Sequence, residues 1–261
     1  MELHAIDRGQ AFDFGKTSAA YAAYRDIYPP VLYDRLRALG VAADGTDWLD
    51  LGTGTGVLPK NLYNSKASIT GVDVSAEQIA FARQEAADHG RQITYLVSPA
   101  EATGLPDHSF DTITAAQCFW YFDRETMRAE IRRLLRPGGK LIKIVMDWEP
   151  ADPIAARSIG TVQAFNPNWT GGGGVGADIY DELFPGRQTE VFDVDLPFTR
   201  ESWHGRMCAC RGTLASMDAA TFRAWELAHL AFLAQCPAEF NVRHKLCLTW
   251  FTINEAAERS V

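Results

Sequence analysis

The sequence has 261 residues, of which 47% are hydrophobic and 22% charged, as expected for a globular protein with enough apolar residues for a core. Asp and Glu outnumber Lys and Arg by 33 to 25, and the formal net charge of −8 disfavours a nucleic acid as partner. No apolar run reaches the length of a membrane span, and the first residues lack the basic and apolar regions of a signal peptide, so no membrane partner is expected.

The five cysteines indicate reduced thiols in a cytoplasmic protein, because an odd number in a chain of this size does not suggest a disulfide framework. Cys208 and Cys210 form one close pair, but no second pair of ligands has a matching spacing. No metal site is therefore expected.

The first half of the chain predicts a helix over 30–39 and then a glycine loop between a strand and a helix. Trp48 to Leu51 is a short apolar run typical of a buried strand, Gly52, Gly54 and Gly56 follow it, and residues 57–64 continue as a helix. Glycines are needed where the backbone turns tightly or lies against a ligand. This order of elements indicates a cofactor loop.

The glycine spacing distinguishes between cofactors. It does not fit the Gly-x-Gly-x-x-Gly pattern of dinucleotide sites, and the Gly-Lys-Ser/Thr ending of a phosphate-binding loop is absent. Asp50, two residues before Gly52, suits a ligand that carries an ammonium or sulfonium charge.

Further strands are predicted over 68–73, 92–97, 110–116 and 140–146, with helices over 76–89 and 124–136 between them. Asp73 ends the second strand, 21 residues after Gly52, close to the separation at which a strand-end carboxylate binds ribose hydroxyls. Ser75 is expected to cap the helix that follows, and Asp123 the helix before the fifth strand.

Four segments in this order resemble the motifs of the class I S-adenosylmethionine-dependent methyltransferases: 50–56, 71–75, 100–111 and 134–141. The resemblance covers residues 20–147 closely. It implies an α/β fold: a Rossmann-like, mostly parallel seven-stranded sheet with an antiparallel last strand and helices on both faces. It also implies S-adenosylmethionine as cofactor, with contacts from Tyr24, Arg25, Asp50, Gly52, Thr53, Gly54, Gly56, Asp73, Val74, Ala100, Glu101 and Gln117.

The resemblance extends to the N-terminal segment, whose aromatic residues match the cap that lies across the cofactor in many members. Aromatic faces attract a sulfonium cation, although these side chains could equally pack a helix against the sheet. Arg25 could pair with the carboxylate of the cofactor. The chain departs from the family at Pro99, where an Asp is common; Ser98 or a backbone carbonyl could replace that contact with adenine.

The segment after the fourth strand, residues 117–122, is expected to face the methyl group and its acceptor. It lacks the Asn/Asp-Pro-Pro-Tyr/Phe motif and the Pro-Cys nucleophile of nucleic-acid methyltransferases, which favours a small-molecule acceptor. Tyr121 and His204 are candidate catalytic residues, although a lone histidine in a helix more often packs or lies at the surface. The candidate acceptor-binding residues are Trp120, Trp148, Arg206 and Arg211; the two arginines could bind an acceptor carboxylate or form a solvated face.

Beyond residue 147 the family pattern weakens. Residues 148–188, with the run Gly171 to Gly174, predict either a mobile lid or an exposed linker. A sixth strand is expected over 190–196, mostly helical structure over 201–217, a helix over 221–234 and the last strand over 242–253. We expect one methyltransferase domain over 1–261, with an N-terminal cap over 1–40, a cofactor-binding core over 41–147 and acceptor-side insertions over 148–188 and 198–238.

Three other functions stay open at this level. The chain could bind the cofactor without catalysis, as a sensor or assembly partner, because the loop residues report binding and not chemistry. It could methylate tRNA or a protein, which the acidic balance makes less favourable. A nicotinamide oxidoreductase is disfavoured by the glycine spacing.

Overall fold

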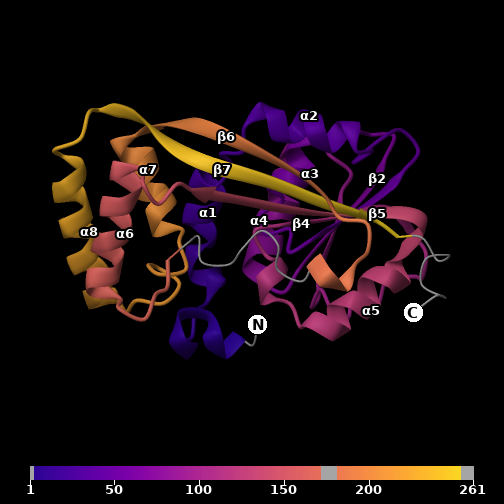
Figure 1. Cartoon of the computed structure of the whole chain (residues 1–261), viewed down its shortest axis with the longest axis horizontal. Helices are drawn as coiled ribbons and strands as arrows, with labels where there is room; N and C mark the ends of the chain where they lie inside the picture. Colours follow the sequence, from indigo (N-terminus) through magenta and orange to yellow (C-terminus); the bar gives the residue numbers. More distant parts are fainter. Residues whose placement is uncertain (1–2, 172–180, 254–261) are drawn as a thin grey trace. The chain divides into compact units, whose positions relative to one another are not determined.

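A computed structural model describes residues 3–171 and 181–253 of the chain (Figure 1). Its seven strands form one sheet in the order β3-β2-β1-β4-β5-β7-β6. The strands are β1 (Asp47–Leu51), β2 (Ser68–Asp73), β3 (Thr94–Val97), β4 (Phe110–Ala116), β5 (Leu135–Trp148), β6 (Gln188–Thr199) and β7 (Glu239–Thr252).

Strand direction follows the predicted pattern. β1 pairs in parallel with β2 and with β4, and β3 and β5 continue the parallel set on either side. β7 is antiparallel to β5. The Gly138 N–H donates to the Ile253 carbonyl oxygen near one end of the pair, and the Glu149 N–H donates to the Arg243 carbonyl oxygen just beyond the other end, so residue numbers rise along one strand as they fall along the other. The predicted Rossmann-like methyltransferase fold is confirmed.

The helices are α1 (Ser18–Tyr24), α2 (Pro30–Ala38), α3 (Val57–Asn61), α4 (Ala76–Asp88), α5 (Arg124–Leu134), α6 (Pro153–Phe165), α7 (Arg200–Cys208) and α8 (Ala219–Leu233). Four short 3₁₀ segments accompany them: η1 (Leu3–Gly9), η2 (Phe14–Thr17), η3 (Phe119–Tyr121) and η4 (Asp181–Leu183). Ser75 caps α4 and Asp123 caps α5, as predicted. Among the helices of the described residues, none has the length and apolarity needed to cross a membrane.

The chain divides into two compact units, which we describe separately. The glycine-loop unit comprises Tyr28–Val145, Ala177–Val191 and Cys247–Val261, and therefore contains α2 to α5. The helical unit comprises Met1–Ile27, Met146–Gly176 and Phe192–Leu246, and contains α1 and α6 to α8. This division places residues 28–40 in the glycine-loop unit, whereas the sequence analysis grouped them with the N-terminal cap. The single-domain assignment itself stays a prediction.

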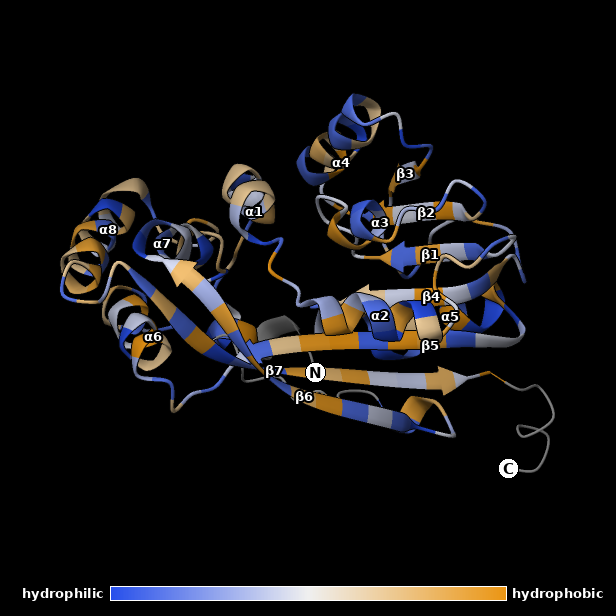
Figure 2. Ribbon diagram, turned by 90° about the horizontal axis from the view of Figure 1, so that it is seen from above, coloured by the Kyte–Doolittle hydropathy of each residue, from blue (hydrophilic) through white to orange (hydrophobic). Residues whose placement is uncertain are grey.

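The core of the glycine-loop unit lies on its parallel strands. Leu49, Leu51, Val72 and Ile113 are fully buried there, and the apolar face of α5 packs on the same cluster through Ile131. In Figure 2 the inner parts of β4 and β5 are correspondingly hydrophobic, whereas α4 alternates between polar and apolar residues. These buried strands fix the edge at which the loops after β1, β2 and β4 emerge.

The second half departs from the sequence analysis at two places. Residues 153–165 form helix α6, which was not predicted; Asp152 accepts hydrogen bonds from the Ile154 and Ala155 N–H groups and Pro153 begins the first turn. The helix expected over 201–217 ends at Cys208, where the Thr213 hydroxyl donates to the Cys208 carbonyl oxygen. Gly172 to Gly174, part of the predicted lid, lie outside the described residues.

Candidate active site

The loop between β1 and α3 has three glycines in the left-handed region of backbone conformation. The φ angles of Gly52, Gly54 and Gly56 are 62°, 57° and 77°, values that L-residues with side chains rarely adopt. Space is restricted as well: a Cβ at Gly52 would lie 2.7 Å from the Cys118 sulfur, and one at Gly56 would lie 2.4 Å from the Tyr95 hydroxyl oxygen. The sequence therefore builds a loop of bare backbone at the carboxyl end of β1.

Asp73, at the end of β2, holds its carboxylate against this loop. Oδ2 accepts a hydrogen bond of 2.8 Å from the Gly54 N–H, and Oδ1 accepts one of 2.9 Å from the Ser75 N–H. Burial raises the pKa of Asp73, and the two N–H donors act in the opposite direction. Each carboxylate oxygen has a further lone pair with which a ligand hydroxyl could be bound. Val74, the next residue, is 73% exposed beside it.

Asp50 is buried beneath the loop, and both of its carboxylate oxygens accept hydrogen bonds from hydroxyl groups. Thr53 donates to Oδ2 over 2.7 Å, and Thr114 on β4 donates to Oδ1 over 2.5 Å. Burial raises the pKa of Asp50 to about 7, although the two hydroxyl donors lower it. The carboxylate thus ties the glycine loop to β4 through Thr53. Its predicted contact with a cationic ligand stays a prediction.

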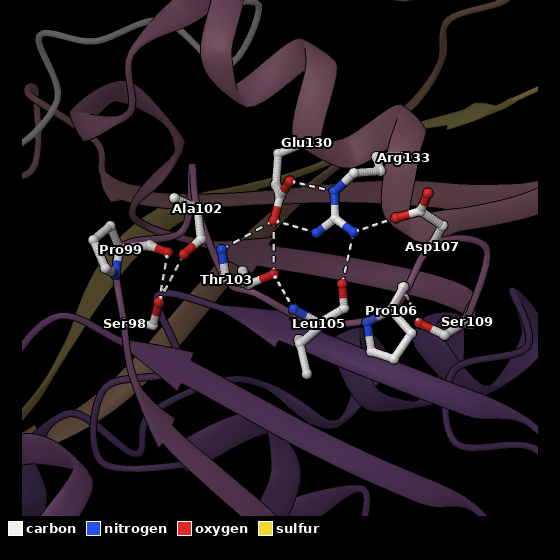
Figure 3. Close-up of polar contacts among 10 residues, drawn as sticks. All are labelled: Ser98, Pro99, Ala102, Thr103, Leu105, Pro106, Asp107, Ser109, Glu130 and Arg133. Carbon is white, nitrogen blue, oxygen red and sulfur yellow. Dashed lines mark hydrogen bonds and ion pairs between the residues drawn. The ribbon is translucent and has the colours of Figure 1, made fainter.

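The loop between β3 and β4 contains the residues expected near adenine. Ala100 is buried, and Glu101 accepts a hydrogen bond of 2.9 Å from the Asp123 N–H at the start of α5. The Ser98 hydroxyl donates within the loop, to the Ala102 carbonyl oxygen at 3.0 Å (Figure 3). The Ser98 oxygen has lone pairs with which it could accept a hydrogen bond from a ligand, but its O–H already donates to Ala102.

Glu130 and Arg133 on α5 hold this loop in place, a role that the sequence analysis missed. Glu130 accepts from the N–H and the hydroxyl of Thr103, at 3.0 and 2.7 Å, and Arg133 binds both of its oxygens (Figure 3). Arg133 also donates to the Leu105 carbonyl oxygen over 2.6 Å. Burial alone would raise the pKa of Glu130, yet its hydrogen bonds outweigh burial and lower it. In the sequence, only the i,i+3 spacing of Glu130 and Arg133 on a predicted helix indicated that the two side chains could form an ion pair.

The chain turns sharply where β4 ends. Gln117 has a positive φ of 58°, unusual for a residue with a side chain, and its N–H donates to the Ile144 carbonyl oxygen over 2.9 Å. Strained backbone of this kind often occurs at functional sites. Trp120 is buried and Tyr121 half-buried in η3, with ring centroids 5.6 Å apart. Gln117 and Tyr121 therefore occupy the edge of the sheet at which the glycine loop also emerges.

In the helical unit, Tyr24 and Arg25 form the end of α1. The Tyr24 ring packs against Gly205 on α7, where an added Cβ would lie 2.3 Å from the ring. The Arg25 guanidinium lies 4.8 Å from the centroid of the Tyr21 ring. Their predicted contacts with the cofactor stay predictions.

His204 lies among the helices α6, α7 and α8. Its Nδ1 is 2.8 Å from Nδ1 of His229, and its ring stacks on Trp225 with centroids 5.5 Å apart. His229 in turn contacts the Ser158 hydroxyl at 3.0 Å. Burial lowers the pKa of both histidines, that of His229 to about 3. This arrangement favours the packing role that the sequence left open, and the role of His204 as a base stays a prediction.

The two arginines expected to bind the acceptor are not solvated. Arg211 forms a bidentate ion pair with Asp7, with nitrogen–oxygen distances of 2.5 and 2.9 Å. Arg206 is 4% exposed, and its guanidinium lies 5.0 Å from the centroid of the buried Trp148 ring. The solvated-face alternative is therefore wrong for both.

The chain is similar to known methyltransferases. A family model described as a methyltransferase domain matches residues 49–143. The chain is 37% identical over 105 residues to the demethylmenaquinone methyltransferase of Thermus thermophilus, covering 39% of this chain and 47% of that protein. It is 30% identical over 166 residues to the phosphatidylethanolamine N-methyltransferase of Cereibacter sphaeroides, covering 60% of this chain and 75% of that protein.

The chain spans about half the length of the first curated relatives that it matches. The solved structure of YcgJ from Bacillus subtilis has the same fold, with a TM-score of 0.56 at 19% identity, covering 86% of this chain and 98% of that one. The family model matches the part of the chain that contains the glycine loop and Asp73, and the Cereibacter protein is matched over three quarters of its length. The chain belongs to the class I S-adenosylmethionine-dependent methyltransferases.

Proposed function

We propose that the chain transfers a methyl group from S-adenosylmethionine to a small-molecule acceptor. The observation that carries the proposal is the Asp73 carboxylate, held by Gly54 and Ser75 beside a loop of left-handed glycines. Asp73 would bind the ribose hydroxyls, and the bare backbone of Gly52 to Gly56 would lie against the methionine part of the cofactor. When bound, the cofactor supplies a methyl group already activated by its sulfonium.

Several features support a small acceptor over a macromolecule. The chain is acidic, with a net charge of −8, and it lacks the motifs of nucleic-acid methyltransferases after β4. The two relatives named above are described as methylating demethylmenaquinone and phosphatidylethanolamine. One fold serves many acceptors, so these names support a class of acceptor and not an identity.

The chain's own contribution to such a transfer is mainly positioning. An in-line displacement needs the acceptor atom and the methyl group held in attack geometry with water excluded. A general base helps only when the acceptor carries a proton at the reacting atom. Tyr121, half-buried in η3 after β4, and His204 are the two candidates for that role; Nδ1 of His204 contacts His229 and Nε2 contacts the Cys208 sulfur.

The test of the cofactor site is calorimetric titration with S-adenosylmethionine and S-adenosylhomocysteine. We expect micromolar binding, on the order of −8 kcal/mol, to the native chain. Asp73→Ala should abolish it, whereas Asp88→Ala, at the exposed end of α4, should not change it. Absence of binding to the native chain, or unchanged binding to Asp73→Ala, would contradict the site.

A second measurement separates catalysis from binding alone. Production of S-adenosylhomocysteine from S-adenosylmethionine in the presence of a small acceptor would support transfer, and Tyr121→Phe and His204→Ala would then report on the two candidate bases. Binding without turnover on any small acceptor would favour a sensor or assembly role. Turnover only with tRNA or protein would contradict the proposed acceptor class.

A further inference from the structure

Lys143 on β5 carries a buried charge in the glycine-loop unit. Its side chain is 1% exposed and lies two residues after Leu141, on the face of the sheet where Leu141 joins the apolar cluster. Asp181 in η4 pairs with its ammonium group, and Nε of Arg187 lies 2.9 Å from the second carboxylate oxygen of Asp181. The cation is therefore held by a carboxylate of the same unit.

Packing alone does not account for a lysine at this position. The rings of Phe119 and Phe251, both in the apolar cluster, have their centroids 5.1 and 5.9 Å from the Lys143 ammonium nitrogen. Apolar side chains of similar volume often replace a buried ion pair without loss of stability. What an apolar side chain would not supply is the attraction between a cation and the face of an aromatic ring, which is strongest where water is excluded.

One of these two rings connects the buried cation to the glycine loop. Phe119 begins η3 and packs edge to face against Phe122, with ring centroids 5.7 Å apart. Phe122 in turn lies against the loop, since a Cβ added at Gly52 would be 3.7 Å from its ring. The Cys118 thiol donates to the Leu51 carbonyl oxygen over 3.2 Å, directly before Gly52. The 3₁₀ turn and its flanking residues therefore contact both the buried cation and the backbone of the cofactor loop.

We propose that Lys143 is a positioning residue for the cofactor site. Its ammonium group, held by Asp181, fixes the Phe119 ring, and through that ring it holds η3 against Gly52. The glycine loop then keeps the shape in which S-adenosylmethionine is bound, so Lys143 acts through Phe119 and not by contact with the cofactor. Tyr121 lies in the same 3₁₀ turn, and its place depends on Lys143 as well. This inference rests on the proposed function, because it concerns how the same site is held.

The test is calorimetric titration of the full chain with S-adenosylhomocysteine, in a mutant cycle between the cation and each ring. The neutral pair, Lys143→Met combined with Asp181→Asn, removes both charges, so that neither stays buried without its partner. We expect the neutral pair to bind about tenfold more weakly than the native chain, the size of a cation–π contact shielded from water. It should cause no further loss in Phe119→Leu, because the ring through which Lys143 acts is then absent.

Phe251→Leu is the matched control, because Phe251 is the second ring beside Lys143 but belongs to β7 and packs against Phe184. In Phe251→Leu the neutral pair should keep its full loss of affinity. Unchanged affinity of the neutral pair, or equal losses in the two ring variants, would overturn the proposal, because Lys143 would then have a structural role only.

If the neutral pair does not fold, fluorinated phenylalanine at position 119 decides, because fluorine weakens the negative face of the ring with little change in its size. Affinity for S-adenosylhomocysteine should fall in steps with di- and trifluorinated rings at Phe119, whereas the same rings at Phe251 should leave it unchanged. Affinity that does not respond to fluorination at Phe119 would overturn the proposal. Absence of S-adenosylhomocysteine binding by the native chain would instead contradict the proposed function.

Discussion

The hydroxyl of Thr114 on β4 donates a hydrogen bond of 2.5 Å to the buried carboxylate of Asp50 on β1. The Thr114 hydroxyl oxygen in turn accepts a hydrogen bond of 2.9 Å from the Trp48 indole N–H. The Thr53 hydroxyl donates to the other carboxylate oxygen of Asp50. A chain of donors therefore runs from the core of the sheet to the glycine loop. Because its members are buried, each depends on the others for its hydrogen bonds.

Thr114→Val should destabilise the protein strongly. Valine has the same shape but leaves the Trp48 N–H and one Asp50 oxygen without this partner, at a cost of about 2–4 kcal/mol in the free energy of unfolding. Thr112→Val is the matched control, two residues earlier on β4, where the buried hydroxyl has no hydrogen-bond partner among the described residues. Urea unfolding should show little change, or a gain, for Thr112→Val. Equal losses in the two variants would contradict the donor chain.

Asp50 should make stability fall as the pH rises. Its pKa is raised from 3.8 to about 7 in the folded chain, so the folded state holds a proton that the unfolded state releases over this range. The contribution of Asp50 is therefore fully present below pH 3.8 and lost as the pH rises through about 7. Between about pH 5 and pH 7, the free energy of unfolding of Asp50→Asn should rise relative to that of the native chain by on the order of 2–3 kcal/mol. Parallel pH profiles of the two proteins in urea unfolding would contradict this.

The sequence predicted the parallel half of the fold well because its signals are local. The strands over 68–73 and 110–116 have the predicted bounds, since each is an apolar run that ends at a polar turn. The proximity of Asp73 to the glycine loop also followed from sequence, because parallel strands end at one edge of the sheet. Helix α6 was missed although Asp152 and Pro153 form a readable start signal.

Other parts of the site could not be predicted, because they depend on tertiary contacts. Asp7 and Arg211 are 204 residues apart in sequence, and neither carries a local sign of the ion pair they form. Asp147 directly follows the strand predicted over 140–146, and nothing local in the sequence indicates the burial that raises its pKa. The packing of His204 against His229 likewise joins two helices whose contact no spacing in the sequence reveals.

Gly56→Ala should damage the cofactor loop beyond the cost of backbone strain. Its φ of 77° penalises a side chain by about 1–2 kcal/mol, and the new Cβ would also meet the Tyr95 hydroxyl. Gly90→Ala, with a φ of 63° and no atom within 4 Å of the added Cβ, separates the two effects. Gly90→Ala should lose only the strain term in urea unfolding and retain binding of S-adenosylhomocysteine.

Tyr95→Phe in the Gly56→Ala background should recover part of the loss. The Tyr95 hydroxyl is buried without a hydrogen-bond partner among the described residues, so its removal alone should be neutral or stabilising. Recovery would show that the collision with this hydroxyl, and not φ alone, requires glycine at position 56. Identical stability of the single and double variants would contradict the collision.

Glu130→Gln should loosen the loop between β3 and β4. Glutamine keeps the size of the side chain but removes the negative charge that pairs with Arg133 and accepts two hydrogen bonds from Thr103. The free energy of unfolding should fall by about 1–3 kcal/mol at neutral pH. The folded pKa of Glu130 is lowered from 4.5, so this contribution is present above pH 4.5 and lost as the pH falls through the lower folded value. The difference between variant and native chain in urea unfolding should therefore shrink on acidification. Glu125→Gln, on the same helix at 70% side-chain exposure, should cost almost nothing at either pH. A loss of equal size at both pH values would mean that Glu130 acts through packing and not through its charge.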